Sequence, residues 1–111
     1  TMSSDLLHKK CIPCEGGVNP LSEHEYKKYL DQLKGWIVKD GKKIEKDFSF
    51  KNFKEAVAFI NSIATIAEHE GHHPDILLYR WNNIKITCYT HTINGLHEND
   101  FILAAKIDSI K

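Results

Sequence analysis

The sequence has no long apolar run and no excess of charge of either sign. No apolar segment approaches the ~18 residues that are needed to span a bilayer, and residues 1–10 lack the apolar stretch and cleavage site of a secretory signal. Lysine plus arginine and aspartate plus glutamate each number 15, so the formal net charge of the 111-residue chain is zero. This balance argues against nucleic acid or a membrane as a partner and favours self-association. We therefore expect a cytoplasmic, oligomeric protein.

Cysteine is also scarce: the three cysteines are too few, and odd in number, for a disulfide framework. Cys11 and Cys14 form a C-x-x-C pair, but loop-forming residues follow it rather than the helix of a thioredoxin-type redox site. A zinc ribbon would need a second such pair, which the sequence lacks. We expect a reduced pair in an irregular arm, residues 1–20, before a single domain of residues 21–111. Thr1, which precedes Met2, is expected to be a remnant of an expression vector.

Capping and turn signals predict a helix and a hairpin in the first half of the domain. Ser22 and Glu25 form a capping box, and Gly35 is expected to end the helix that follows. Strands are predicted over 36–39 and 44–50, because Asp40-Gly41 between them tolerates the positive φ angles of a tight hairpin turn.

The second half of the domain predicts a long helix, a second hairpin and a final helix. Asn52 and Glu55 begin the long helix, which should end near Glu70 because Gly71 and Pro74 follow. Strands are predicted over 76–81 and 84–91 with a turn at Asn82-Asn83, and the final helix from about Glu98. The apolar stripe of the long helix is predicted to be Phe53, Ala56, Val57, Ile60, Ile63, Ala64 and Ala67, and that of the final helix Leu103, Ala104, Ile107 and Ile110.

The order of elements is helix, two strands, helix, two strands, helix. Hairpins imply antiparallel pairing, and the helices must cover one face of the sheet to bury their apolar stripes. The sequence therefore predicts an α+β fold of two layers, a four-stranded antiparallel sheet with helices on one face. The uncovered face or a free strand edge is expected to be buried between subunits.

Histidine is the most informative residue type, with seven in the chain. Its unperturbed pKa of ~6.5 lets an imidazole both give and take protons near neutrality. His72 and His73 follow the end of the long helix, and His91 lies at the end of the strand that returns beside them. We expect these three histidines to be neighbours at one end of the sheet.

His69, Glu70 and His73 also match H-E-x-x-H, the zinc-protease signature. That motif requires a continuous helix, which directs both imidazoles toward the metal. Gly71 interrupts it here, and Pro74 disfavours the helical conformation at the residue before it. We therefore expect no metal site.

Two carboxylates are expected at the same end of the sheet. Glu68 lies in the last turn of the long helix, just before the histidines. Asp100 falls in the first turn of the final helix on its apolar stripe, where the helix dipole favours a negative charge and an inward direction requires a partner. Residue type alone leaves open whether Asp100 serves the histidines or only bonds to backbone donors of its own helix.

At these residues the sequence resembles the pterin-4a-carbinolamine dehydratases. The family motif has a charged residue, a histidine pair followed by a small residue or proline, an aromatic residue, a further histidine and an aspartate. The matching residues are Glu68, His72, His73, Pro74, Trp81, His91 and Asp100. The resemblance extends to Gly95-Leu96 before the final helix and to Cys14-Glu15-Gly16-Gly17 in the arm, which is similar to that of bacterial members.

The resemblance implies an enzyme that eliminates water across C4a and N5 of a 4a-hydroxytetrahydropterin to give the quinonoid dihydropterin, without metal or cofactor. The pterin would come from an aromatic amino acid hydroxylase. The family fold is an antiparallel four-stranded sheet backed by helices, and members form dimers and tetramers. His72 and His91 are expected to transfer protons, with His73 holding the pterin and sharing the work. Glu68 and Asp100 would orient the imidazoles.

The ring pocket is expected to be lined by these histidines and by the residues beside them, Pro74, Tyr89, Thr90 and Thr92. Gly71 departs from the family, because many relatives carry a polar residue there. His97 stands where a serine-like helix cap is expected, and we interpret it as a weaker cap rather than a fourth catalytic histidine. Which histidine is the acid and which the base remains open.

Two alternatives come with the resemblance. Animal members of the family also act as dimerisation cofactors for a homeodomain transcription factor, so a non-catalytic binding protein is one alternative. A pterin role that serves molybdenum cofactor is the other. A protein that only binds could lose the active-site histidines freely, so their presence favours catalysis.

Overall fold

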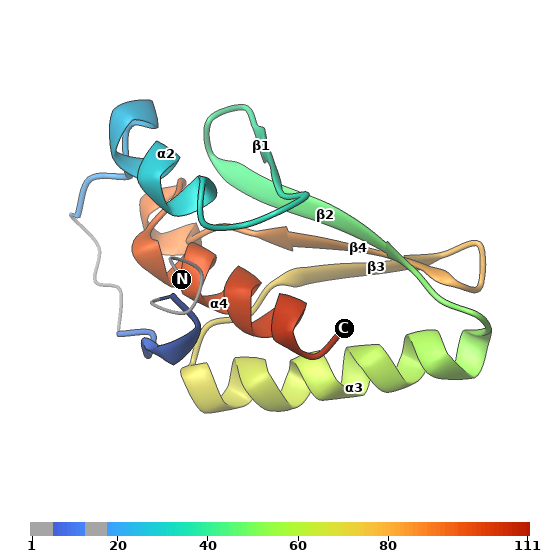
Figure 1. Ribbon diagram of the computed structural model, residues 1–111. Coiled ribbons are helices and arrows are strands. Elements are labelled where there is room, and N and C mark those ends of the chain that lie inside the picture. Colours follow the sequence, from blue (N-terminus) through green and yellow to red (C-terminus); the bar gives the residue numbers. More distant parts are fainter. Residues whose placement is uncertain (1–5, 13–17) are drawn as a thin grey trace.

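The computed structural model describes residues 6–12 and 18–111, and it has the predicted α+β architecture (Figure 1). Thr1, Cys14 and the segment Cys14-Glu15-Gly16-Gly17 lie outside the described residues. The order of the main elements is helix, two strands, helix, two strands, helix, as predicted. Among the described residues, no helix has the length and apolar character to cross a bilayer.

The sheet has four antiparallel strands in the order β1-β2-β4-β3. The strands are β1 (Ile37–Lys39), β2 (Lys43–Ser49), β3 (Asp75–Tyr79) and β4 (Asn83–Cys88). Alternate residues of the central strands point to the same face of the sheet, and on one face these residues are mostly apolar. That face carries Ile44, Phe48, Ile84, Ile86 and Cys88, all buried. This face receives the helices and places the core between the two layers.

The two hairpin turns have similar backbones but different sequences. Asp40 and Gly41 have φ angles of 55° and 67°, which confirms the first turn. The second turn was wrongly predicted at Asn82-Asn83. It is formed by Arg80 and Trp81, with φ angles of 52° and 59°, while Asn83 begins β4 and pairs with Tyr79. The side-chain amide of Asn82 instead donates to the carbonyl of Phe50 at 2.8 Å, a tertiary contact that accompanies a turn two residues earlier than predicted.

Helix α2 (Glu23–Leu30) begins at the predicted capping box, in which Ser22 and Glu25 accept each other's backbone N–H. The helix ends at Leu30 rather than at Gly35. Tighter i→i+3 hydrogen bonds follow, from Gln32 to Tyr29 and from Leu33 to Leu30. They let the chain turn toward β1 while Leu33 still packs on the core.

Helix α3 (Phe53–Glu70) has the predicted boundaries, capped by Asn52 and ended by Gly71 in the left-handed region at φ 67°. Its apolar stripe differs from the prediction. Phe59 is buried, whereas Phe53 and Ala64 are exposed. Phe59 lies 5.0 Å from the ring of Phe48 and 4.9 Å from that of Phe50, so aromatic packing against β2 sets the rotation of α3.

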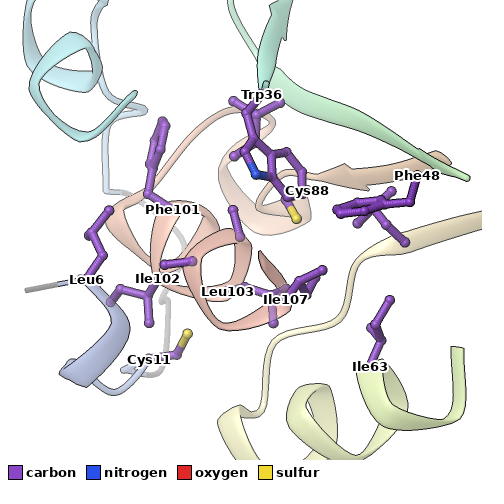
Figure 2. Packing of buried hydrophobic residues seen from close by; sticks show 14 of the residues in the cluster. Leu6, Cys11, Trp36, Phe48, Ile63, Cys88, Phe101, Ile102, Leu103 and Ile107 are labelled. Carbon is purple, nitrogen blue, oxygen red and sulfur yellow. The ribbon is translucent and has the colours of Figure 1, made fainter. Parts of the chain in front are cut away.

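Helix α4 (Glu98–Ser109) lies beside α3 on the apolar face of the sheet and also contacts α2 (Figure 1). Its residues from Asn99 to Ala105 are all buried, a wider surface than the predicted stripe. Ile110, which the stripe included, is exposed at the end of the chain. Figure 2 shows Phe101, Ile102, Leu103 and Ile107 within the cluster of buried side chains.

Residues 6–12 also contribute to this core. Residues 6–8 are helical, and Leu6 and Cys11 are buried on the side of α4 where Ile102 lies (Figure 2). The expectation of an irregular arm did not foresee this packing, because no local pattern in the sequence indicates it. The separation of residues 1–20 from a domain of residues 21–111 stays a prediction.

Candidate functional site

A cavity of about 250 Å³ lies at the connection between α3 and β3, beside the turn that follows β4. It is smaller than the roughly 300–1,000 Å³ of pockets for drug-sized ligands, as suits a small ring system. The cavity is lined by Ile12, Gly71, His72, His73, Thr90, His91, Thr92 and Asn99. The structure therefore brings together the three histidines and two threonines that the sequence singled out. Pro74 and Tyr89 lie next to lining residues but are not among them.

Gly71 directs His72 into the cavity. Its left-handed backbone ends α3, while the N–H groups of Gly71 and His72 both donate to the carbonyl of Ala67. The side chain of His72 is only 12% exposed. Its Nε2 lies 2.6 Å from Oδ1 of Asp100 in α4, so the histidine that follows one helix meets the first turn of another.

Asp100 is fully buried and accepts three hydrogen bonds. Besides His72, the hydroxyl of Thr90 and the backbone N–H of His97 donate to its Oδ2, each at 2.9 Å. The imidazole of His97 accepts from the N–H of Asn99 at 3.0 Å, so His97 and Asp100 form a capping box for α4. Asp100 makes the contacts of both alternatives: it caps its own helix and it contacts a histidine. His97 is a cap, as predicted, and is not among the residues that line the cavity.

His73 points to a different carboxylate. Its Nε2 lies 2.5 Å from Oε2 of Glu68, one turn back on α3, and both side chains are largely exposed. The adjacent histidines thus reach the cavity with different partners, one at a buried carboxylate and the other at a solvated one. The contact between His73 and Glu68 is weaker than the one between His72 and Asp100, because exposed ion pairs contribute at most about 1 kcal/mol.

His91 is not in a strand, since β4 ends at Cys88. Thr90 bridges to Gly95, and His91 begins the short 3-10 helix η1 (His91–Ile93). The ring of His91 lies 4.1 Å from that of Tyr89, and the ammonium of Lys43 lies 4.8 Å from the centroid of the Tyr89 ring. Tyr89 therefore supports His91 from the side.

This arrangement is suited to proton transfer. Two imidazoles each have one nitrogen occupied by a carboxylate, which leaves the other nitrogen available to a ligand.

His69 and His73 lie on opposite sides of the helix end at Gly71, so H-E-x-x-H does not lie on one continuous helix. Within residues 6–12 and 18–111, no group of three or more histidine, cysteine, aspartate or glutamate side chains could hold a metal ion.

Sequence reasoning missed two of the side chains that line the cavity, those of Ile12 and Asn99, and it interpreted Gly71 only as a helix end and a departure from the family. The carboxamide of Asn99 is hydrogen-bonded to the backbone of Ile12 in both directions, at 3.1 Å and 2.6 Å. A pairing across most of the chain length leaves no periodic signal in the sequence. The one available hint was an asparagine next to Asp100, on the buried side of a helix where an amide requires partners.

Comparison with known proteins gives consistent results. Residues 19–110 match the family model for pterin 4 alpha carbinolamine dehydratase. A relative from Alkaliphilus metalliredigens that carries the name pterin-4-alpha-carbinolamine dehydratase is 52% identical over 106 residues, which cover 95% of each chain. One of the same name from Nitrosospira multiformis is 48% identical over 110 residues, covering 99% of this chain and 96% of its own.

Two solved structures share the fold. The Brucella melitensis protein described as a transcriptional coactivator/pterin dehydratase superposes with a TM-score of 0.76 at 36% identity, covering 83% of this chain and 98% of its own. A pterin dehydratase-like protein described as a RuBisCO assembly factor in the alpha-carboxysome gives a TM-score of 0.58 at 24% identity, covering 68% and 88%. At that identity the second likeness concerns the fold alone.

Proposed function

Since the chain belongs to the pterin-4a-carbinolamine dehydratase family, we propose that it removes water from a 4a-hydroxytetrahydropterin to give the quinonoid dihydropterin. The observation that carries this proposal is the buried contact of 2.6 Å between His72 and Asp100 at a cavity that His73 and His91 also line. A histidine that only filled space would not need a buried carboxylate behind it.

The reaction requires two proton transfers and no redox change. The C4a–O bond breaks as the hydroxyl gains a proton and leaves as water, while N5 loses its proton and its electron pair forms the C4a=N5 double bond. An acid and a base placed at these atoms each contribute a rate factor of roughly 10²–10⁴.

We assign the base to His72. Asp100 accepts its Nε2–H, so the neutral ring carries its free electron pair on Nδ1, where the N5 proton can be taken. The charge that His72 then acquires is stabilised by the buried carboxylate. His91 then provides the proton for the departing hydroxyl, since its ring lines the same cavity from η1.

His73 is assigned to holding the pterin. Its contact with Glu68 fixes the ring orientation, and the exposure of both groups places them at the rim of the site rather than at its floor. Thr92 offers a hydroxyl group to the polar edge of a pterin, whereas the hydroxyl of Thr90 donates to Asp100 and is left to accept from the ligand. Under this proposal Pro74 and Tyr89 support the lining residues beside them, and Tyr89 does so through its ring contact with His91.

The metabolic partner that fits this chemistry is an aromatic amino acid hydroxylase, whose reaction produces the 4a-hydroxytetrahydropterin. A non-catalytic binding role is the alternative class, since the solved relative from Brucella melitensis is described as a coactivator as well as a dehydratase. Catalysis is favoured here because the site retains all three histidines with both carboxylates in contact.

The test is a direct assay. A 4a-hydroxytetrahydropterin is generated in place by an aromatic amino acid hydroxylase, and formation of the quinonoid dihydropterin is followed by absorbance with and without the purified protein. We expect the protein to accelerate this step well above its spontaneous rate. No acceleration at micromolar protein would contradict the proposal and favour the binding role.

A further inference from the structure

Residues 11 and 12 are held against the first turn of α4 and the end of α3. The N–H of Ile12 donates to Oδ1 of Asn99 at 3.1 Å, and Nδ2 of Asn99 donates back to the carbonyl of Ile12 at 2.6 Å. In this reciprocal pair, the carboxamide of Asn99 takes the place that the backbone of a second β-strand residue would have. Asn99 is only 2% exposed, so its amide is dedicated to this contact.

A buried carboxylate fixes the preceding residue. The N–H of Cys11 donates to Oε1 of Glu70 at 2.8 Å, and Nζ of Lys106 lies 3.3 Å from Oε2 of the same group. Burial acts to raise the pKa of Glu70, but the Cys11 N–H and the Lys106 ammonium outweigh it and lower that pKa below its ordinary value. Glu70 is therefore a charged acceptor that ties residues 6–12 to both α3 and α4.

The side chain of Ile12 contrasts with this anchored backbone. It is 61% exposed and lines the cavity, where every other lining residue is glycine or polar. A lone exposed isoleucine needs no explanation on an ordinary surface. Here the backbone is fixed by buried polar groups and the apolar side chain is left uncovered beside three histidines. That combination presents a preformed apolar surface to whatever enters the cavity.

We propose that Ile12 packs against a face of the bicyclic pterin ring and that Asn99 is the positioning residue that holds it there. A pterin is polar along its edges and apolar on its faces, so a polar cavity with one apolar residue matches it. This inference rests on the proposed function. It adds a specificity-determining residue from the N-terminal segment to a site otherwise lined by residues that follow α3 and β4 and by residues of η1 and α4.

The first test compares Ile12→Ala with Ile110→Ala, a control, because Ile110 is also an exposed isoleucine and does not line the cavity. We expect Ile12→Ala to raise KM roughly fivefold, as loss of partial apolar contact predicts, with kcat within about twofold of the parent. Ile12→Val should recover most of the affinity, and Ile110→Ala should leave both constants unchanged. Equal KM values for Ile12→Ala and the parent would overturn the inference.

The second test asks whether Asn99 acts through Ile12. Asn99→Asp keeps the volume of the side chain but cannot donate to the Ile12 carbonyl, so KM should rise. In the double variant Ile12→Ala with Asn99→Asp, the second change should raise KM no further than Ile12→Ala alone. Fully multiplicative effects would contradict a positioning role for Asn99.

Two further measurements separate the possible failures. Fluorescence titration with 7,8-dihydrobiopterin gives a Kd that does not depend on turnover, and Ile12→Ala should weaken it as much as it raises KM. The rise should be equal for substrates with a methyl or a dihydroxypropyl group at C6; a rise confined to the longer group would contradict contact with the ring. An inactive parent protein would refute the proposed function, whereas an active parent with an unaffected Ile12→Ala would refute this inference alone.

Discussion

Nε2 of His72 lies 2.6 Å from Oδ1 of Asp100, a carboxylate with no exposed surface. The other oxygen of Asp100 accepts from Thr90 and from the N–H of His97, which begins α4. One carboxylate therefore caps a helix and contacts an imidazole at the same time. The proposed base, His72, is held in a fixed position, because the carboxylate that it contacts belongs to α4, which is buried along most of its length.

Replacing Asp100 with Asn is expected to affect the reaction more than the fold. The Asn carbonyl can still accept from Thr90 and His97, but its NH₂ group would donate to His72 and favour the tautomer with the proton on Nδ1. The dehydration rate should fall by on the order of 10²-fold, while the free energy of unfolding falls by about 1–3 kcal/mol. Rate assays and denaturant unfolding measure both quantities. A parental rate in a folded Asp100→Asn variant would remove Asp100 from the mechanism.

The fold was predictable where the signals are local. The capping box of Ser22 and Glu25, the Asn52 cap and the Asp40-Gly41 turn were predictable, because their side chains hydrogen-bond to nearby backbone groups or permit positive φ angles. The second turn was missed because Arg80 and Trp81 are poor candidates for positive φ, whereas Asn82-Asn83 is an ordinary turn signal. Asn82 instead donates to the carbonyl of Phe50, which lies in another part of the chain, and the turn forms at Arg80 and Trp81.

The site was predictable to a similar degree. The three histidines were expected together, because hairpin geometry returns β4 to the start of β3. Ile12 and Asn99 could not be foreseen, since their pairing depends on residues 6–12 packing against α4. The roles of the histidines and carboxylates, and the cytoplasmic location, stay predictions.

Stability should decline at alkaline pH because of Cys11. Burial, with the nearby Glu70 charge, raises the pKa of its thiol from an ordinary value of 9.0 to about 12. Between these values the unfolded chain loses the proton and the folded chain keeps it, so the free energy of unfolding falls as pH rises. One thiol contributes at most about 1.4 kcal/mol per pH unit.

The check is denaturant unfolding of the parent and of Cys11→Ala from pH 8 to pH 10.5, a range set around that ordinary pKa. The parent should lose stability more steeply than Cys11→Ala above about pH 9. Identical slopes would show that the thiol ionises as easily in the folded protein as in the unfolded chain.

Metal removal should leave the reaction intact. Gly71 ends α3 in the middle of H-E-x-x-H, and the nitrogen Nε2 of His73 contacts Glu68. We expect less than stoichiometric zinc by elemental analysis and unchanged dehydration after exhaustive chelation. One tightly bound zinc ion per chain, whose removal abolishes the reaction, would reverse this interpretation.

The protein is expected to form dimers or tetramers. The sheet face away from the helices carries Ile37 and Leu77, which are 60% and 54% exposed on the edge strands β1 and β3. Edge strands with apolar side chains favour pairing with a second copy, and a net charge of zero opposes it little. Light scattering at micromolar concentration should give at least twice the chain mass. A monomer under these conditions would contradict the expectation.

The most direct test of the account is the rate of 4a-carbinolamine dehydration in His72→Ala and His91→Ala. Each change should slow the reaction roughly tenfold or more, and the double variant should fall short of the product of the single effects, because the two groups act on one reaction. His8→Ala and His24→Ala, at exposed histidines away from the cavity, should match the parent. Rates equal to the parent in both His72→Ala and His91→Ala would contradict catalysis by these histidines and leave a binding protein as the better account.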